Sequence, residues 1–311
     1  MRRVLVTGGG GCLGANVIGH LLAAGDVVLS VDNQATSAAA SLAPHPNLES
    51  VSGTIADRAM VDDLFDRFRP SHVVHSAAAY KDPDDWAEDV STNVIGTINV
   101  TCAAMRLKVR RFINFQTSLC YGRAVERPVT LAHPLAPLSS YAVSKNAAER
   151  YLGLSGLSYA SFRMAIIYGP RHYSGPIPTF YKRLKAGLSC TIADTRRDFV
   201  AMEDFLRLMD LALDDQAPGG VFNVGSGQDH AIKTVFDRLA DILGVRLAEP
   251  PAVMPPNADD VSNLLLDPSA TEAAFGWKTT IGLDDGLRRQ VAWYDAHGAG
   301  QGFTHLRGGK G

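Results

Sequence analysis

The feature that most constrains the fold is a run of four glycines directly after a short apolar segment, in the sequence VLVTGGGGCLGANVIGH. Gly8, Gly11 and Gly14 recur at three-residue spacing between a predicted strand and a predicted helix over residues 15–24. Such a turn brings backbone N–H groups close to a pyrophosphate and packs helix on strand closely, because no side chain intervenes. The run therefore predicts a dinucleotide-binding turn rather than a flexible linker.

The next predicted strand ends at Asp32, about 20 residues beyond the glycines. A carboxylate at this position accepts hydrogen bonds from the adenosine ribose and repels the 2′-phosphate of NADP. No arginine follows Asp32 closely in the sequence. We therefore expect NAD, rather than NADP, as the cofactor.

Short β-rich segments alternate with helical patterns from RVLVTG to RFINFQTS. This alternation predicts a parallel sheet with helices on both faces. After residue 170 the rhythm loosens and prolines cluster, as in EPPAVMPP. We expect an α/β fold, with a Rossmann-type doubly wound parallel sheet in an NAD-binding domain over residues 1–170. A smaller C-terminal α+β substrate domain is expected over residues 171–311, with some elements crossing back.

The composition limits the partners that the chain can bind. The 311 residues include 46% hydrophobic residues, enough for a sizeable core, and carry a net charge of −2. Nucleic acid and anionic membranes attract proteins with a basic excess, so neither is an expected partner. The four cysteines show no metal or disulfide spacing. No apolar run reaches the length of a membrane span or of a signal-peptide core, which favours a cytoplasmic protein acting on small molecules.

The segment SSYAVSKNAAERYL places Tyr141 and Lys145 one predicted helical turn apart, on the same helix face. A tyrosine, with a reference pKa of about 10, becomes a useful base at neutral pH only beside positive charge. Lys145 and an oxidised nicotinamide ring would supply that charge. An ordinary surface pair is the alternative, and the dinucleotide turn on the same chain argues against it. Thr117, which ends a predicted strand, either offers its hydroxyl to substrate and tyrosine or caps a turn.

The motifs of the chain, in their order along the sequence, resemble those of the extended short-chain dehydrogenase/reductases. The likeness is closest to the nucleotide-sugar epimerase/dehydratase branch of the bacterial O-antigen-cluster type. The likeness covers about residues 1–295 and includes the segments HVVHSAAAYKDPDDWAED and GPIPTFYKRLKAG. The motifs that carry it are Thr7-Gly-x-x-Gly-x-x-Gly14, Asp32-Asn33, His75-Ser-Ala-Ala78, Asn93-Val-x-Gly-Thr97, Thr117 before Tyr121-Gly122, Tyr141-x-x-x-Lys145, Tyr168-Gly-Pro170 and Arg197-Asp-Phe199.

The resemblance implies roles for individual residues. The implied catalytic residues are Tyr141, Lys145 and Thr117. The implied cofactor site adds to Tyr141 and Lys145 the residues Gly8, Gly11, Cys12, Leu13, Gly14, Asp32, Asn33, Thr54, Ile55, Ala77 and Asn93. The implied substrate contacts are Lys81, Ile177, Lys182 and Arg197. The resemblance also implies a homodimer formed through helices over residues 93–108 and 141–154. Separately, Asp57 is expected to cap the helix that follows it.

The chain departs from the family pattern where the reaction is decided. Dehydratases of the family carry an Asp-Glu pair directly after the threonine, and this chain has Ser118 and Leu119 there. Ile166 replaces a phosphate-contacting asparagine, and Asn257 stands where an arginine is expected. Elimination of water is therefore not expected, and the nucleotide part of the substrate stays open.

The reaction that we expect is a redox-neutral, NAD-dependent epimerisation at C4 of a nucleotide-linked hexose or hexuronic acid, through a transient 4-keto sugar. Two alternatives stay open. One is a keto-sugar reductase or dehydratase of the same family that uses NAD or NADP. The other is a non-catalytic NAD-binding protein, against which the intact set of Thr117, Tyr141 and Lys145 argues.

Overall fold

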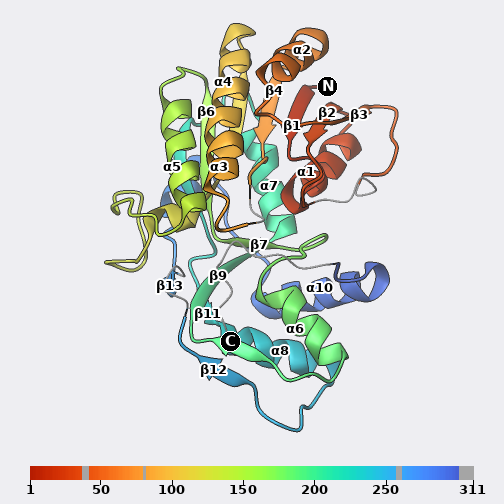
Figure 1. The fold of residues 1–311 in the computed structure, drawn as a ribbon, viewed down its shortest axis with the longest axis vertical. Helices are drawn as coiled ribbons and strands as arrows, with labels where there is room; N and C mark the ends of the chain where they lie inside the picture. Colours follow the sequence, from red (N-terminus) through yellow and green to blue (C-terminus); the bar gives the residue numbers. More distant parts are fainter. Residues whose placement is uncertain (37–41, 80–81, 257–260, 301–311) are drawn as a thin grey trace.

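The computed structural model describes residues 1–36, 42–79, 82–256 and 261–300. A seven-stranded parallel sheet with helices on both faces forms the upper part of Figure 1, which confirms the predicted α/β doubly wound fold. The strand order reverses at β1, so a crevice is expected at the carboxyl edge of the sheet, beside this strand. Across the sheet the strands are β10 (Gly220–Val224), β6 (Tyr159–Met164), β5 (Arg111–Thr117), β4 (His72–His75), β1 (Arg3–Thr7), β2 (Val27–Asp32) and β3 (Leu48–Ser52).

Each face of the sheet packs against its own helical layer. Val4 and Val6 of β1 point into the core on one face, and Leu5 between them points into the core on the other. This two-sided burial explains why the central strands read as continuous apolar runs. The first face is covered by α1 (Cys12–Ala23), α7 (Met202–Ala212) and α9 (Ser269–Phe275), and the second by α2 (Arg58–Phe68), α4 (Thr97–Arg106) and α5 (Ser140–Gly153).

The lower part of Figure 1 is smaller and mixed in structure. Helices α6, α8 and α10 share one apolar core with strands of two small sheets, one four-stranded and one two-stranded. The helices are α6 (Pro176–Lys185), α8 (Ile232–Leu243) and α10 (Leu283–His297); the strands are β7 (Ile166–Tyr168), β8 (Thr191–Ala193), β9 (Arg196–Ala201), β11 (Asp229–Ala231), β12 (Ala252–Met254) and β13 (Asn263–Leu264). Three short helical segments complete the described elements: α3 (Trp86–Glu88), the π-helix η2 (Asp89–Gly96) and the 3-10 helix η3 (Ser118–Tyr121).

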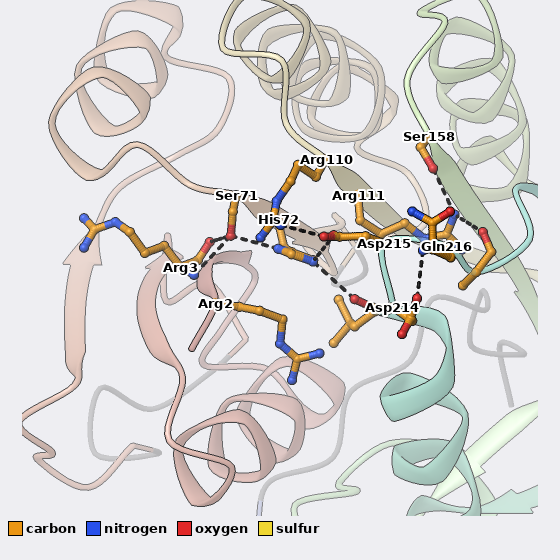
Figure 2. A network of polar contacts seen from close by, with 12 residues as sticks. Arg2, Arg3, Ser71, His72, Arg110, Arg111, Ser158, Asp214, Asp215 and Gln216 are labelled. Carbon is orange, nitrogen blue, oxygen red and sulfur yellow. Dashed lines mark hydrogen bonds and ion pairs between the residues drawn. The ribbon is translucent and has the colours of Figure 1, made fainter.

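Residues 202–224 return from the smaller part to the large sheet, where α7 packs beside α1 and β10 extends β6. A polar network at the amino edge of the sheet holds this connection (Figure 2). The Arg111 guanidinium donates to the carbonyls of Ala212 at 2.8 Å and Pro218 at 2.7 Å. The ring of His72 lies 3.1 Å from Asp215. The domain boundary at residue 170 stays a prediction, and residues 202–224 are the segment that crosses it.

Helix α1 begins at Cys12, three residues earlier than the pattern predicted. Gly11 is its N-cap, so the end of the glycine run forms the first helical turn. Gly14 lies inside the helix, where a Cβ atom would come within 2.2 Å of the Gly8 carbonyl oxygen. Asp57 caps α2 as predicted, accepting a backbone N–H of the first turn at 3.1 Å. No helix in the described part of the chain combines the length and apolar character that crossing a membrane requires.

Candidate active site

A cleft of about 940 Å³ lies at the carboxyl edge of the large sheet. We call the part of its lining contributed by residues 8–145 the cofactor wall, and the part contributed by residues 164–198 the substrate wall. The cofactor wall includes the turn after β1, the ends of β2 and β5 and one face of α5. The substrate wall includes β7, the start of α6, β8 and the start of β9.

The glycine turn forms one end of the cofactor wall. Gly8 has a φ of +67°, and a Cβ atom there would lie 2.6 Å from the backbone nitrogen of Ala77, so only glycine fits. Gly11, Cys12 and Leu13, at the amino end of α1, line the cleft directly. Backbone N–H groups at a helix start favour an anion, so this cradle fits the pyrophosphate of a dinucleotide.

Asp32 is held at the end of β2 by two backbone groups. One carboxylate oxygen accepts the N–H of Gly10 at 2.9 Å, and the other accepts that of Gln34 at 2.7 Å. The carboxylate therefore stays on the cleft lining, where a ribose hydroxyl can reach it. Farther along the same wall, Asn99 donates to the Ile55 carbonyl at 3.0 Å and fixes the expected adenine end of the site.

A buried chain of hydrogen bonds connects the cofactor wall to the helix behind it. The Ala77 N–H donates to the Thr7 hydroxyl at 3.2 Å, and this hydroxyl lies 2.8 Å from Nδ1 of His75. The ring's Nε2 lies 2.8 Å from the Thr97 hydroxyl, which donates its own proton to the Asn93 carbonyl. Because Thr97 donates to Asn93, its oxygen accepts Nε2–H, which in a neutral ring leaves Nδ1 to accept the Thr7 hydroxyl. Burial accordingly lowers the pKa of His75 to about 3.

Helix α5 presents Tyr141 and Lys145 to the cleft together, as their spacing predicted. Burial lowers the pKa of Lys145 to about 8, and the nearby Glu149 carboxylate opposes that shift. The lysine is thus mostly protonated at neutral pH, although it is only 2% exposed. Gln116, at the end of β5, donates to the Lys145 carbonyl at 2.7 Å and ties the helix to the sheet.

Glu149, one turn beyond the lysine, forms a buried ion pair with Arg163 of β6 at 2.5 Å. It also accepts a hydrogen bond from the Ser161 hydroxyl at 2.7 Å. These contacts fix α5 on the sheet. The hydroxyl of Thr117 accepts the Leu119 N–H at 3.2 Å, which is the expected cap. Thr117 also lines the cleft, and the contact of its hydroxyl with substrate stays a prediction.

Most of the predicted site residues meet in this cleft, and among those that the structure describes three do not line it. Gly14 packs beneath the glycine turn, and Ile177 is fully buried in the core of the smaller part. Asn93 lies behind the wall and donates to the Ser144 hydroxyl at 2.9 Å. Lys81, like Asn257, falls outside the described residues. Those that line the cleft are Gly8, Gly11, Cys12, Leu13, Asp32, Asn33, Thr54, Ile55, Ala77, Thr117, Tyr141, Lys145, Lys182 and Arg197.

The substrate wall carries two basic side chains that the sequence predicted, Lys182 and Arg197. It also carries one carboxyl group, Asp198, that sequence reasoning did not single out. Lys182 donates to the Gly300 carbonyl at 3.1 Å, and Arg197 donates to the Ser262 carbonyl at 3.1 Å. Asp198 is 2% exposed and accepts the Ser226 hydroxyl at 2.6 Å, while burial raises its pKa to about 6.

His172 and Thr191 also line the substrate wall, and sequence reasoning missed both. The motif around Arg197 offered a signal for Asp198, which follows it directly. For His172, the only signal is its position two residues beyond Tyr168-Gly-Pro170.

Comparison with known proteins agrees with this geometry. The model of the NAD dependent epimerase/dehydratase family matches residues 4–225. The chain belongs to this family. The resemblance derived from the sequence is thereby confirmed, and with it the prediction of an NAD-dependent site.

Three relatives illustrate the range of the family. The Bordetella bronchiseptica enzyme WbmG, crystallised with NAD and UDP, is 51% identical in sequence to this chain. The two structures superpose with a TM-score of 0.94, and the match covers 98% of this chain and 99% of WbmG. A UDP-glucose 4-epimerase of Mycolicibacterium smegmatis is 29% identical over 94% of this chain and 98% of its own length. A dTDP-glucose 4,6-dehydratase of Actinoplanes sp. is also 29% identical, over 95% of this chain and 98% of its own length. The family alone therefore does not distinguish epimerisation from elimination.

Proposed function

We propose that this protein is an NAD-dependent epimerase that inverts C4 of a nucleotide-linked hexose or hexuronic acid through a transient 4-keto sugar. The observation that carries the proposal is the meeting of Thr117, Tyr141 and Lys145 on one wall of a cleft that also contains the glycine turn and Asp32. When bound, NAD supplies the chemistry of removing a hydride from the sugar carbon and returning it to the opposite face.

The chain's own residues would handle the proton. Tyr141 takes the proton of the sugar hydroxyl, and the Lys145 ammonium favours the ionised form of the phenol. The Thr117 hydroxyl has already accepted the Leu119 N–H, so its own proton remains available to the sugar oxygen. The same set serves the return step, because the tyrosine gives the proton back when the keto sugar is reduced.

The carboxyl groups of the cleft support epimerisation over elimination. Loss of water needs an acid and a base beside the sugar, and positions 118 and 119 carry a serine and a leucine on the cleft wall. Among the described lining residues, the carboxylates are Asp32, held by backbone N–H groups at the cofactor end, and Asp198, which accepts hydrogen bonds from Ser226. Neither replaces a pair that follows Thr117 directly.

The test is to incubate NAD-loaded protein with UDP-, GDP-, CDP- and dTDP-linked hexoses and hexuronic acids. The expected product is the C4 isomer, with no net change in NADH and with the cofactor retained through purification. Stoichiometric consumption of the cofactor would identify a reductase instead. A product lighter by one water would identify a dehydratase, and no turnover on any member of the panel would support the non-catalytic alternative.

We further propose that the enzyme is a homodimer and that its product serves lipopolysaccharide O-antigen assembly, as the sequence resemblance implies. Helices α4 and α5 pack side by side (Figure 1), and these helices, with η2 before α4 and the residue that ends α5, carry exposed apolar side chains. These are Ile95, Met105, Val143, Tyr151 and Leu154. A patch of this kind is typical of a subunit interface. Light scattering should show a dimer that the double variant Val143→Glu/Tyr151→Glu converts to a monomer; a wild-type monomer would contradict the proposal.

A further inference from the structure

His172 occupies the turn that connects β7 to α6 and lines the substrate wall of the cleft. Its backbone is held on both sides. The N–H donates to the Gly169 carbonyl at 3.1 Å, and the carbonyl accepts the hydroxyl of Tyr294. The residue is only 7% exposed, so the imidazole has little freedom to turn toward solvent.

The ring of His172 differs from those of the other buried histidines. His72, His75 and His133 each have partners on both ring nitrogens. Nδ1 of His172 is buried and has no hydrogen-bond partner among the residues that the structure describes. Leaving a buried polar group unpaired is costly, so such a group in a cleft wall points to a ligand as the missing partner.

The protonation of the ring decides what it offers to a ligand. Burial lowers the pKa of His172 to about 4, so the imidazole is neutral at physiological pH. A neutral imidazole carries one proton, and with that proton on Nδ1 the unpaired nitrogen is itself an N–H donor. The ring therefore offers an N–H donor, which suits an oxygen atom of a ligand.

The turn around His172 is fastened to the helix that begins at the glycine run. Asn16 donates to the Pro170 carbonyl at 2.8 Å, and the Cys12 thiol contacts the same oxygen at 3.6 Å. Burial raises the pKa of Cys12 to about 12, and the positive charge of Arg171 opposes that shift, which places this cation near the start of α1. An anion at the glycine turn would thus have the His172 turn as its other neighbour.

We propose that His172 donates a hydrogen bond to a pyrophosphate oxygen of the bound dinucleotide, so that the substrate wall completes the cofactor site. The proposal rests on the proposed function only through the cofactor and is tested without any sugar. The glycine motif alone predicts that residues 8–14 contact the pyrophosphate. The proposal adds a contact from a turn in the smaller part of the molecule.

The experiment measures binding of NAD, ADP-ribose and UDP to wild type, His172→Leu and His172→Gln by calorimetry. The leucine variant should bind NAD and ADP-ribose about tenfold more weakly, because a hydrogen bond to a charged group is lost. Glutamine, which keeps an N–H donor, should recover part of the affinity. UDP affinity should not change. Thermal unfolding provides the control for folding, and the leucine variant should be no less stable than wild type, because it removes an unpaired polar group.

A spectroscopic readout keeps the proposal testable if the variants fail to fold. In ¹⁵N-labelled wild type, NAD and ADP-ribose should shift the ring nitrogens of His172 and raise its pKa, because a phosphate stabilises the imidazolium. Unchanged NAD and ADP-ribose affinities would overturn the assignment, and so would a loss confined to UDP. If no sugar is epimerised but these shifts appear, the proposed function fails while this contact stands.

Discussion

The two walls of the cleft differ in how their polar groups are satisfied. Asp32 on the cofactor wall and His75 directly behind it have their partners within the chain: backbone N–H groups for Asp32 and threonine hydroxyls for His75. On the substrate wall, Ile166 and Ile167 are apolar, and His172 leaves a buried nitrogen unpaired within the described structure. Asp32 and His75 are thus paired without a ligand, whereas His172 is not fully paired.

Paired polar groups preorganise a binding site, whereas unpaired groups make it selective for the ligand that pairs them. Side chains that are hydrogen-bonded within the chain keep their positions before the cofactor binds, which lowers the entropy cost of binding. A wall with apolar surface and an unpaired donor gains more from the ligand that fits it, and loses more from one that does not. Breaking the paired contacts of His75 should therefore lower stability, whereas replacing His172 should weaken ligand binding without lowering stability.

The largest effect is expected at Tyr141. Tyr141→Phe keeps the ring and its packing but removes the proton acceptor, so turnover should fall by about 10²–10⁴-fold while NAD affinity stays the same. Steady-state kinetics on the sugar identified by the panel and calorimetry with NAD check this. Thr117→Val, which removes only an orienting hydroxyl, is the matched control and should lose less. Near-native turnover of the phenylalanine variant would place the base elsewhere.

Removing the charge behind the tyrosine should cost a comparable factor for a different reason. Lys145→Met keeps a stem of similar length in its buried site, but leaves the phenol protonated at neutral pH. Activity should return in part as the pH rises toward the unperturbed tyrosine pKa of about 10. A pH–rate profile decides this, because a purely structural defect would show no recovery at high pH.

The success of sequence reasoning follows the same division between the walls. The glycine turn, Asp32 and the Tyr141/Lys145 pair depend on spacing within one strand, turn or helix, so the chain reveals them directly. The substrate wall depends on β9 pairing with β7 and on α6 packing against α8, contacts between residues far apart in sequence. Asp198 and His172 were therefore missed. The return of β10 to the large sheet was expected only in general terms, because no local pattern fixes where a short strand pairs.

A third prediction compares a paired histidine with an unpaired one through pH. Burial lowers the pKa of His75 to about 3 and that of His172 to about 4, against about 6.5 in an unfolded chain. Below pH 6.5 the unfolded state binds more protons, so the free energy of unfolding falls as the pH falls. Each histidine contributes a slope of about 1.4 kcal/mol per pH unit, extending down to its folded pKa.

The two variants should then diverge at neutral pH. His75→Gln breaks a buried chain of hydrogen bonds and should lower the free energy of unfolding by about 1–3 kcal/mol at pH 7.5. His172→Leu should not lower it. Both should flatten the slope between pH 6.5 and pH 4.5 in urea titrations. Equal destabilisation by the two variants would remove the distinction between the walls.

The smallest effect concerns the choice between NAD and NADP, and it isolates charge from geometry on the cofactor wall. Asp32 sits where a 2′-phosphate would lie, so NAD should bind at least tenfold more tightly than NADP, a difference of about 1.4 kcal/mol. Asp32→Asn keeps an oxygen that accepts the backbone N–H of Gly10 or Gln34, but it removes the negative charge. Its preference for NAD should shrink, mainly through tighter NADP binding. Asp32→Ala loses the backbone contacts as well and should also weaken NAD. Calorimetry with both dinucleotides separates these effects, and equal affinities of the wild type would show that the carboxylate does not face the ribose.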